Sequence, residues 1–288
     1  MDKKIVLVTG ATDGIGKEAA RALAKQNFKV ILHGRNEEKA KSVEKEIKEE
    51  YPEADIDIML ADLLSFKNVK KLAESVIAKY DHLDVLINNA GAIFSKERVL
   101  TEDNEERTYQ LNVFSPFLLS YLLLPLIQKS KSGRIIYESS IAHLGARRID
   151  LDDMKSEKSY GAFDNYSRSK LYGIWMARQF IKYMKEKGIT NVTYNIAHPG
   201  ASATNFGKNV DKGFFINLGT NIATLFMITS AEGAKSEIYL ATSPEVEGKN
   251  GLYINPKCKE EKISERLWTE ENERKIWEYC MNTCKNFM

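Results

Sequence analysis

Seven short runs of apolar and often β-branched residues recur along this chain, and longer amphipathic segments separate them. In the segment after the second run, Ala40, Val43 and Ile47 repeat at helical spacing, and Ser65 is a good N-cap for the next such segment. This alternation is typical of βαβ units, so it predicts an α/β fold with a doubly wound parallel sheet and helices on both faces. The seven expected strands are 4–9, 28–33, 56–60, 83–88, 133–139, 192–197 and 252–255.

Length and composition fit one globular domain over residues 1–288. The chain has 43% hydrophobic and 28% charged residues, and a chain of this size buries roughly three quarters of its unfolded surface. No repeat or Pro/Gly/Ser-rich linker divides it. We expect a substrate lid at about 200–230 and a helical tail at about 260–288. The lid segment is rich in Phe and Leu, which suits an apolar ligand, although ordinary packing explains the same composition.

Charge and hydropathy argue against two classes of partner. The net charge is +2, and basic residues are scattered among acidic ones, so no footprint for a nucleic-acid backbone is present. The longest apolar stretch, 113–127, is interrupted by Ser115, Pro116, Ser120 and Pro125. It falls short of the ~18 residues that span a bilayer. We therefore expect a buried helix and no membrane span.

The cysteines and the start of the sequence bear on the compartment. Only four apolar residues, 5–8, follow the polar start, which is too short for a secretory signal. Three cysteines, an odd number, are confined to the tail (Cys258, Cys280 and Cys284). Such usage fits reduced thiols, so the expected location is cytoplasmic. No histidine accompanies the cysteines, and we expect no metal site.

A glycine-rich segment follows the first expected strand and opens the first expected helix. Its glycines allow a tight turn and a close approach of the backbone to a pyrophosphate, whose charge the start of the helix stabilises. The strand, turn and helix context therefore predicts a dinucleotide site. The expected contacts come from Gly10, Thr12, Asp13, Gly14, Ile15 and Gly16.

The end of the second expected strand indicates which dinucleotide binds. NAD-binding sheets place an acidic residue there for the ribose hydroxyls, but this chain has His33-Gly34-Arg35-Asn36. Arg35 offers a planar cation that suits a 2′-phosphate. We predict NADP, with NAD less favoured and with contacts from Arg35 and Asn36. A charge-assisted contact of about 1.5–3 kcal/mol corresponds to a preference of roughly ten- to a hundredfold. The alternative is that Arg35 is a solvated loop cation.

Tyr166 and Lys170 are four residues apart and share one helix face. They follow a loop that begins at Ser140, at the carboxyl end of a strand, where open α/β sheets bind ligands. Reduction of a carbonyl needs a proton donor, and a tyrosine with a pKa of ~10 is too weak an acid near neutrality. The Lys170 ammonium and an oxidised nicotinamide would both favour tyrosinate. Two other Tyr/Lys pairs have this spacing, but Pro256 disfavours a helix in one, and Tyr183 lies at the charged end of its helix in the other.

These motifs resemble the short-chain dehydrogenase/reductase family over about residues 4–255, which implies a Rossmann-type seven-stranded fold. The gap between Ser140 and Tyr166 is similar to that of the retinol-dehydrogenase-like branch. The resemblance rests on the glycine loop, Asn88-Asn89-Ala90-Gly91, Ile141-Ala142-His143, Tyr166-x-x-x-Lys170 and Pro199-Gly200.

The resemblance implies a role for each matching residue. Ser140 would polarise the substrate oxygen, Tyr166 would be the general acid/base, and Lys170 would hold the nicotinamide ribose and tune Tyr166. Asn112 would anchor a water between Lys170 and solvent. Further cofactor contacts are implied for Asp62, Leu63, Asn89, Ala90, Pro199 and Thr204.

The chain also departs from the family pattern. Tyr137 and Glu138 stand where relatives usually have Asn-Val, and Ser202 replaces a branched apolar residue. His143 and His198 are expected to be hydrogen-bonding residues, not catalysts. Helices around 111–128 and 165–185 form dimers in many family members, which suggests a homodimer.

The sequence therefore predicts an NADP(H)-dependent oxidoreductase that interconverts a carbonyl compound and its alcohol, with Tyr166 as general acid/base. The apolar lid segment suggests a lipophilic small-molecule substrate. One alternative is a nucleotide-binding regulatory protein without turnover, although the four residues Asn112, Ser140, Tyr166 and Lys170 argue against it. Another is an enzyme of the same fold that reduces a carbon–carbon double bond or epimerises its substrate.

Overall fold

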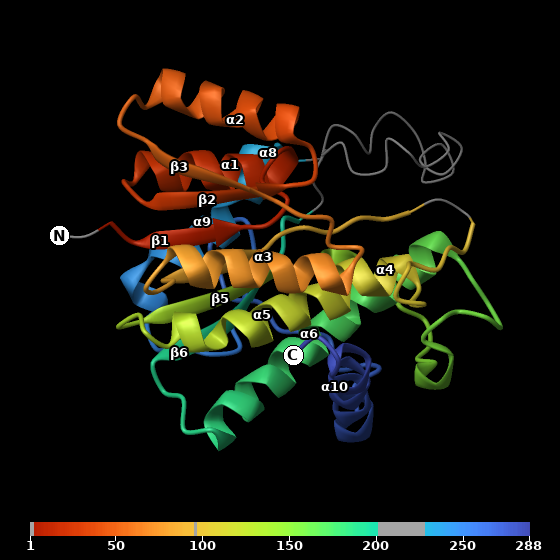
Figure 1. The fold of residues 1–288 in the computed structure, drawn as a ribbon. Coiled ribbons are helices and arrows are strands. Elements are labelled where there is room, and N and C mark those ends of the chain that lie inside the picture. The colour runs from red at the N-terminus through yellow and green to blue at the C-terminus, as the bar shows by residue number, and fades with distance from the viewer. Residues whose placement is uncertain (1–2, 95–96, 201–227) are drawn as a thin grey trace.

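The computed structural model describes residues 3–94, 97–200 and 228–288. Within these ranges, seven strands form one sheet in the order β3-β2-β1-β4-β5-β6-β7, and all neighbours are parallel. The predicted doubly wound sheet is confirmed (Figure 1). The strands are β1 Ile5–Val8, β2 Lys29–Gly34, β3 Asp55–Leu60, β4 Val85–Asn88, β5 Gly133–Glu138, β6 Val192–Ala197 and β7 Tyr253–Ile254.

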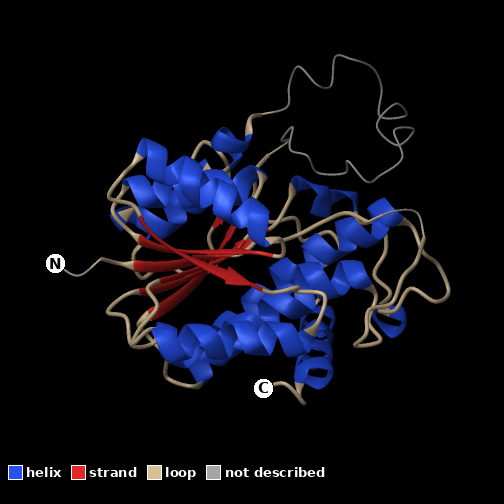
Figure 2. Ribbon diagram, turned by 45° about the horizontal axis from the view of Figure 1, so that its top comes forward, coloured by secondary structure: helices blue, strands red, loops and turns tan. Residues whose placement is uncertain are grey.

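Helices cover both faces of the sheet (Figure 2). One apolar cluster joins the sheet to α1, α2 and α9, and a second joins it to α3, α5 and α6. Short helical turns occupy the loops between these elements. The helices are α1 Gly14–Lys25, α2 Glu37–Glu50, α3 Phe66–Lys79, α4 Arg107–Tyr109, η1 Gln110–Phe114, α5 Ser115–Ile127, η2 Ile141–Gly145, η3 Leu151–Asp153, α6 Ala162–Glu186, α8 Ser230–Gly233, α9 Lys235–Thr242, η5 Pro244–Val246 and α10 Glu270–Cys284.

The helix positions follow from local sequence. Ser65 caps α3, because its side chain accepts a hydrogen bond from the N–H of Asn68. The stripe Ala40, Val43 and Ile47 of α2 is buried, as its spacing predicts. The apolar stripe of α2 therefore faces the sheet, and the apolar residues of α3 are buried in the same way.

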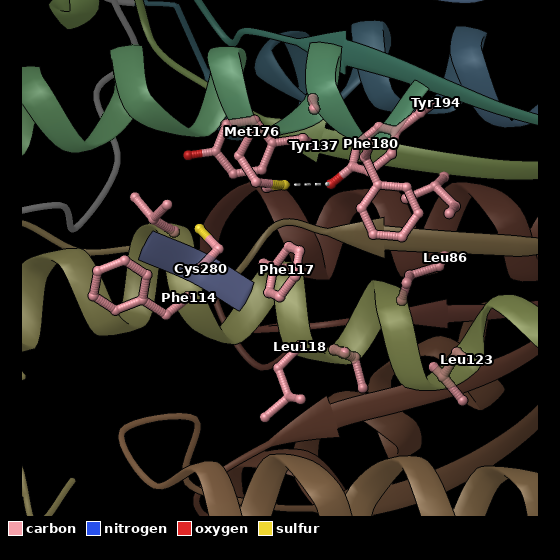
Figure 3. Packing of buried hydrophobic residues seen from close by; sticks show 14 of the residues in the cluster. Leu86, Phe114, Phe117, Leu118, Leu123, Tyr137, Met176, Phe180, Tyr194 and Cys280 are labelled. Atoms are coloured by element: carbon pink, nitrogen blue, oxygen red, sulfur yellow. Dashed lines mark hydrogen bonds between the residues drawn. The ribbon is translucent and has the colours of Figure 1, made fainter. Parts of the chain in front are cut away.

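A continuous helical stretch runs from Arg107 to Ile127 and contains the π-helical turn η1 between α4 and α5. By length and composition it could cross a membrane, but 78% of its apolar 18-residue segment is buried inside the protein. It is the buried helix that the sequence predicts for 113–127. Phe117 of this stretch packs near Phe180 of α6, with ring centroids 6.2 Å apart (Figure 3).

The predicted C-terminal helix is α10, and it lies across α5 and α6 (Figure 1). The ring of Trp277 meets Phe117 and Phe180 at centroid distances of 5.2 and 5.7 Å. Buried Glu273 receives ion pairs from Arg178 and Lys182 of α6 at 3.1 and 3.0 Å. The tail is therefore part of the core, and its Cys280 and Cys284 are buried free thiols, while Cys258 is also free.

The predicted lid at 200–230 lies almost wholly outside the described residues, which resume at 228. Ser202 and Thr204 fall in the same gap. The lid and their contacts stay predictions.

Candidate active site

The glycine loop joins β1 to α1, and a neighbouring side chain holds its shape. Gly10 has a φ of +66°, a conformation that glycine adopts readily. The Asn89 amide, just beyond β4, donates hydrogen bonds to the carbonyls of Thr9 and Gly10 at 2.8 and 3.3 Å. The N–H of Ala90 donates to the Thr9 hydroxyl at 3.0 Å. The structure thus brings together the predicted Gly10, Asn89 and Ala90.

Gly16 allows this close packing. A Cβ at this position would lie 2.3 Å from the amide nitrogen of Asn89 and 2.6 Å from the carbonyl oxygen of Gly10. Any side chain would therefore displace the loop from Asn89. Asp13 caps α1 by accepting a hydrogen bond from the N–H of Gly14 at 2.8 Å.

His33, which the sequence analysis did not assign to the site, supports the loop from β2. Its Nδ1 accepts a hydrogen bond from the N–H of Gly10 at 3.3 Å, and its Nε2 donates to the carbonyl of Ala61 at 3.2 Å. Burial lowers the pKa of His33 to about 4, so the ring is neutral near pH 7. The next residue, Gly34, leaves room for Thr12, whose methyl carbon lies 2.4 Å from the position of a Cβ there.

The residues predicted to select the cofactor lie after β2 and β3. Arg35 is exposed and makes no hydrogen bond or ion pair with the described part of the chain. Asn36 caps α2 through its side-chain oxygen, which accepts from the N–H of Lys39 at 2.9 Å. Asp62 is exposed and Leu63 is buried. Arg35 is therefore available to an anion.

These residues fit a nicotinamide dinucleotide. The cradle between Gly10 and Gly16 leaves no room for a Cβ, and it lies at the start of α1, where helical N–H groups favour a phosphate. On the adjoining side, the position of a Cβ on Gly91 would lie 3.0 Å from the Lys170 ammonium nitrogen. The glycine loop, the residues after β4 and Lys170 therefore lie next to one another in space.

Ser140 and Tyr166 meet at the carboxyl end of β5. The Tyr166 phenol hydrogen-bonds the Ser140 side chain, and the Ser140 hydroxyl also accepts from the N–H of Ala142 at 3.1 Å. Ser139 points elsewhere, because its hydroxyl donates to the backbone carbonyl of Lys170 at 3.3 Å. Of the two serines, Ser140 is therefore the one beside the Tyr166 phenol, and its role in catalysis stays a prediction.

Lys170 lies one helical turn after Tyr166 in α6, and both are buried, at 3% and 6% exposed. Its ammonium nitrogen is 5.8 Å from the centre of the Tyr166 ring and donates to the backbone carbonyl of Glu138 at 2.8 Å. Burial raises the pKa of Tyr166, the Ser140 hydrogen bond lowers it, and the Glu138 charge raises it. The net effect is a raised pKa, because burial is the largest of these effects. The lowered phenol pKa that the sequence predicts depends in addition on the charge of an oxidised nicotinamide.

Spacing alone does not define the site. Lys187 lies 5.7 Å from the centre of the Tyr183 ring, nearly the same distance as in the Tyr166 pair. In that second pair the phenol hydrogen-bonds Tyr121, whereas the Tyr166 phenol hydrogen-bonds Ser140.

Asn112 lies in the π-helical turn η1 and is fully buried. Its amide nitrogen donates to the Ala92 carbonyl and the Ser169 hydroxyl at 3.0 and 2.9 Å, and its amide oxygen accepts from the N–H of Ala92 at 3.0 Å. The side chain therefore ties the segment after β4 to α6. A water bound to Asn112 stays a prediction.

The two departures in β5 point to opposite sides of the sheet. The Tyr137 hydroxyl donates to the backbone carbonyl of Asn112 at 2.8 Å. Its ring fits only because residue 173 is glycine, since a Cβ there would lie 2.0 Å from the phenol oxygen. Glu138 faces α9, where its carboxyl group meets that of Glu237. Sequence spacing gives no sign of either contact.

The structure also shows the contacts of Pro199, Ile15 and the two histidines that the sequence predicts to be hydrogen-bonding residues. Pro199 and Ile15 both approach Gly233, each with a side-chain carbon 3.2 Å from the position of a Cβ there. His143 bonds the Ser140 carbonyl through Nδ1 at 2.7 Å, and His198 bonds Glu261 at 3.1 Å. Both histidines are hydrogen-bonding residues in the structure.

Comparisons with known proteins agree with this geometry. A family model described as short chain dehydrogenase matches residues 4–213. The chain is 35% identical to retinol dehydrogenase 14 of Homo sapiens, over 96% of this chain and 85% of that protein. It is 32% identical to polyprenol dehydrogenase of Homo sapiens, over 95% of this chain and 83% of that protein.

A solved short chain dehydrogenase from Shigella flexneri 2a, complexed with NADP, resembles the chain with a TM-score of 0.69. The two are 26% identical, over 89% of this chain and 98% of that one. The chain therefore belongs to the short-chain dehydrogenase family, in its retinol-dehydrogenase-like branch.

Proposed function

We propose that this protein is an NADP(H)-dependent oxidoreductase that interconverts a carbonyl compound and its alcohol, with Tyr166 as general acid/base. One observation carries the proposal: the Tyr166 phenol hydrogen-bonds Ser140 while the Lys170 ammonium lies 5.8 Å from its ring. This group lies next to the glycine loop through Gly91. A proton donor, a polarising hydroxyl and a cation thus converge beside the expected cofactor site.

Each residue has a defined task in the proposed reaction. The start of α1 and Arg35 would hold the cofactor phosphates, and Lys170 would hold the nicotinamide ribose. The bound cofactor would supply the hydride. During reduction, Ser140 donates a hydrogen bond to the substrate oxygen and Tyr166 gives that oxygen its proton. During oxidation, the Tyr166 phenolate removes the proton from the alcohol.

Two observations support NADP as the cofactor. The guanidinium of Arg35 is exposed and makes no hydrogen bond or ion pair with the described residues, and no carboxylate stands at the end of β2. The solved relative from Shigella flexneri is complexed with NADP. Both favour a site that accepts the 2′-phosphate.

A lipophilic alcohol or aldehyde is the substrate class that we favour. Ile141, Leu144 and Phe163 are 39%, 55% and 40% exposed, on two elements that pack against each other, so large apolar side chains are exposed close together. They lie on η2, which Ser140 caps, and on the first turn of α6, which carries Tyr166. Two relatives are named for retinol and polyprenol, which are both apolar alcohols.

The test is a panel of aldehydes and ketones, including retinal and short polar carbonyls, monitored by NADPH absorbance. We expect oxidation of NADPH with apolar aldehydes. Tyr166→Phe should lower turnover at least about a hundredfold while NADPH binding, followed by fluorescence, stays nearly intact. Tyr183→Phe is the matched control, because it changes the other Tyr/Lys pair of α6 and should leave turnover unchanged.

Each contrary result has a clear meaning. Normal turnover in Tyr166→Phe removes this residue from the mechanism. Tight NADPH binding without oxidation across the panel supports a nucleotide-binding regulator instead. Product analysis by mass and chirality would reveal reduction of a carbon–carbon double bond or epimerisation.

A further inference from the structure

Two glutamate side chains, Glu138 and Glu237, are buried close to each other and to Lys170. Glu138 ends β5 and is 5% exposed, and Glu237 lies in α9 and is fully buried. Because α9 packs against β5, the two carboxyl groups come within hydrogen-bonding reach of each other. A hydrogen bond between two carboxyl groups requires a proton on one of them.

Neither carboxyl group has another donor among the described residues. No group there other than the two carboxyl groups themselves donates to any of the four carboxyl oxygens. Two neighbouring donors are engaged elsewhere: Arg134, four residues earlier on the same side of β5, donates to the carbonyls of Leu240 and Ser243 at 3.0 Å. Ser236 donates to the His198 carbonyl at 3.2 Å. Two ionised carboxylates in this position would repel each other with no hydrogen-bond donor to stabilise them.

Lys170 is the cation that acts on both carboxyl groups. Its charge lowers the pKa of Glu138 and of Glu237, and their charges raise the pKa of Lys170. Burial acts in the opposite direction and more strongly on all three groups. The Glu138 charge also acts on three phenols, from β5, α6 and β7, and burial raises the pKa of each (Tyr137, Tyr166 and Tyr253). These phenols stay neutral near pH 7, so they supply no charge to balance Lys170.

A buried ammonium without a counter-charge is costly. One negative charge on the carboxyl pair would balance it, whereas two would leave an excess and none would leave the ammonium alone. A single shared proton gives the pair this one charge. We propose that Glu138 and Glu237 hold one proton between them and carry the negative charge that keeps Lys170 protonated inside the protein.

The pair consists of positioning residues, because it acts through Lys170 and touches no reacting atom. Its importance for turnover rests on the proposed function, in which the Lys170 ammonium holds the ribose and tunes Tyr166. The shared proton itself can be tested without any substrate, so its failure is distinguishable from failure of the proposed activity.

The first test measures the charge of Lys170 by NMR titration of ¹³C-labelled lysine side chains, with Lys170→Met used to assign the signal. Lys170 should be charged at pH 7 in the unaltered protein. Glu138→Gln and Glu237→Gln should each leave it charged, because the remaining glutamate ionises and keeps the single negative charge. Glu138→Gln/Glu237→Gln removes that charge and should lower the pKa of Lys170 by at least about one unit.

The second test counts protonated carboxyl groups by infrared difference spectroscopy at pH 7 with ¹³C-glutamate labelling. Each single glutamine variant should lose one protonated carboxyl band relative to the unaltered protein, and the double variant should lose nothing more. Difference spectra remove the contribution of other buried glutamates, such as Glu106. The pH profile of turnover should shift in the double variant and stay close to the unaltered one in each single variant.

Three outcomes would overturn the proposal. The first is a neutral Lys170 at pH 7 in the unaltered protein, a result that needs no variant at positions 138 or 237. A further carboxyl band lost between single and double variants means two neutral acids. An unchanged Lys170 titration in a folded double variant means that the pair does not balance its charge.

Discussion

The phenol of Tyr137 occupies the space that a side chain at position 173 would need. A Cβ on Gly173 would lie 2.0 Å from the phenol oxygen and 2.2 Å from the ring carbon that carries it. The contact joins β5, which carries Ser140 at its end, to α6, which carries Tyr166 and Lys170.

Gly173→Ala should therefore destabilise the protein by about 1–3 kcal/mol, because the core is overpacked at this point. Denaturant unfolding measures the change. Gly161→Ala is the control for space: among the described residues its Cβ would meet only the Asp164 Cβ at 3.6 Å, so the change should cost no more than the roughly 0.5–1 kcal/mol expected for alanine at the N-cap of α6. Equal stability of Gly173→Ala and the unaltered protein would contradict the described packing.

Arg35→Asp should raise the Michaelis constant for NADPH much more than that for NADH. The substitution removes the cation expected at the 2′-phosphate, so the preference should fall by roughly ten- to a hundredfold. Lys45→Asp makes the same charge change on an exposed side chain of α2 and controls for general electrostatics. Equal effects of Arg35→Asp on both cofactors would remove Arg35 from cofactor selection.

His33 should make stability depend on pH. Its pKa in the folded protein is about 4, below the ~6.5 of an unfolded chain, so the unfolded state binds the extra proton first. The stabilisation that neutral His33 gives the folded protein is complete above about pH 6.5. It is lost as the pH falls toward 4, which lowers the free energy of unfolding by about 3 kcal/mol in total. His33→Gln should remove this part of the slope in unfolding experiments between pH 7 and 4. A variant with the unaltered slope would mean that His33 titrates normally.

Trp277→Ala should destabilise the protein by roughly 2–3 kcal/mol, because the indole packs against Phe117 and Phe180. Thermal unfolding measures the loss. Glu278→Ala, an exposed neighbour in α10, should change stability by less than about 0.5 kcal/mol. A similar effect of both substitutions would show that α10 is held loosely.

The same helix bears on self-association. The family resemblance suggests a homodimer through the helices around 111–128 and 165–185, whereas α10 packs against α5 and α6 in the structure. We expect the intact chain to be monomeric by light scattering at micromolar concentration, and to associate when α10 is deleted. A stable dimer of the intact chain would require another surface or displacement of α10.

Local sequence was sufficient for the sheet and for much of the site. Alternating strand and helix patterns predict all seven strands, and the glycine loop, Ser140, Tyr166 and Lys170 are recognisable from spacing and context. These features depend on residues close together in the chain. The residues around them were harder to predict.

Contacts between distant segments were not predictable in this way. Glu138 and Glu237 are 99 positions apart, on different elements, and only the packing of α9 on β5 makes them neighbours. His33 reads as a strand residue, and its hydrogen bond to Gly10 depends on the register of β1 beside β2. The fit of Tyr137 to Gly173 likewise requires the side chains to be in place.

The position of α10 has a consequence for synthesis of the protein. Phe287, which follows α10, packs against Phe66 of α3 with ring centroids 5.6 Å apart. During synthesis the parallel strands can pair before residues 270–288 leave the ribosome, but this part of the interior cannot close until those residues emerge. A truncation before Glu270 would therefore yield a product with exposed aromatic surface, prone to aggregation and degradation.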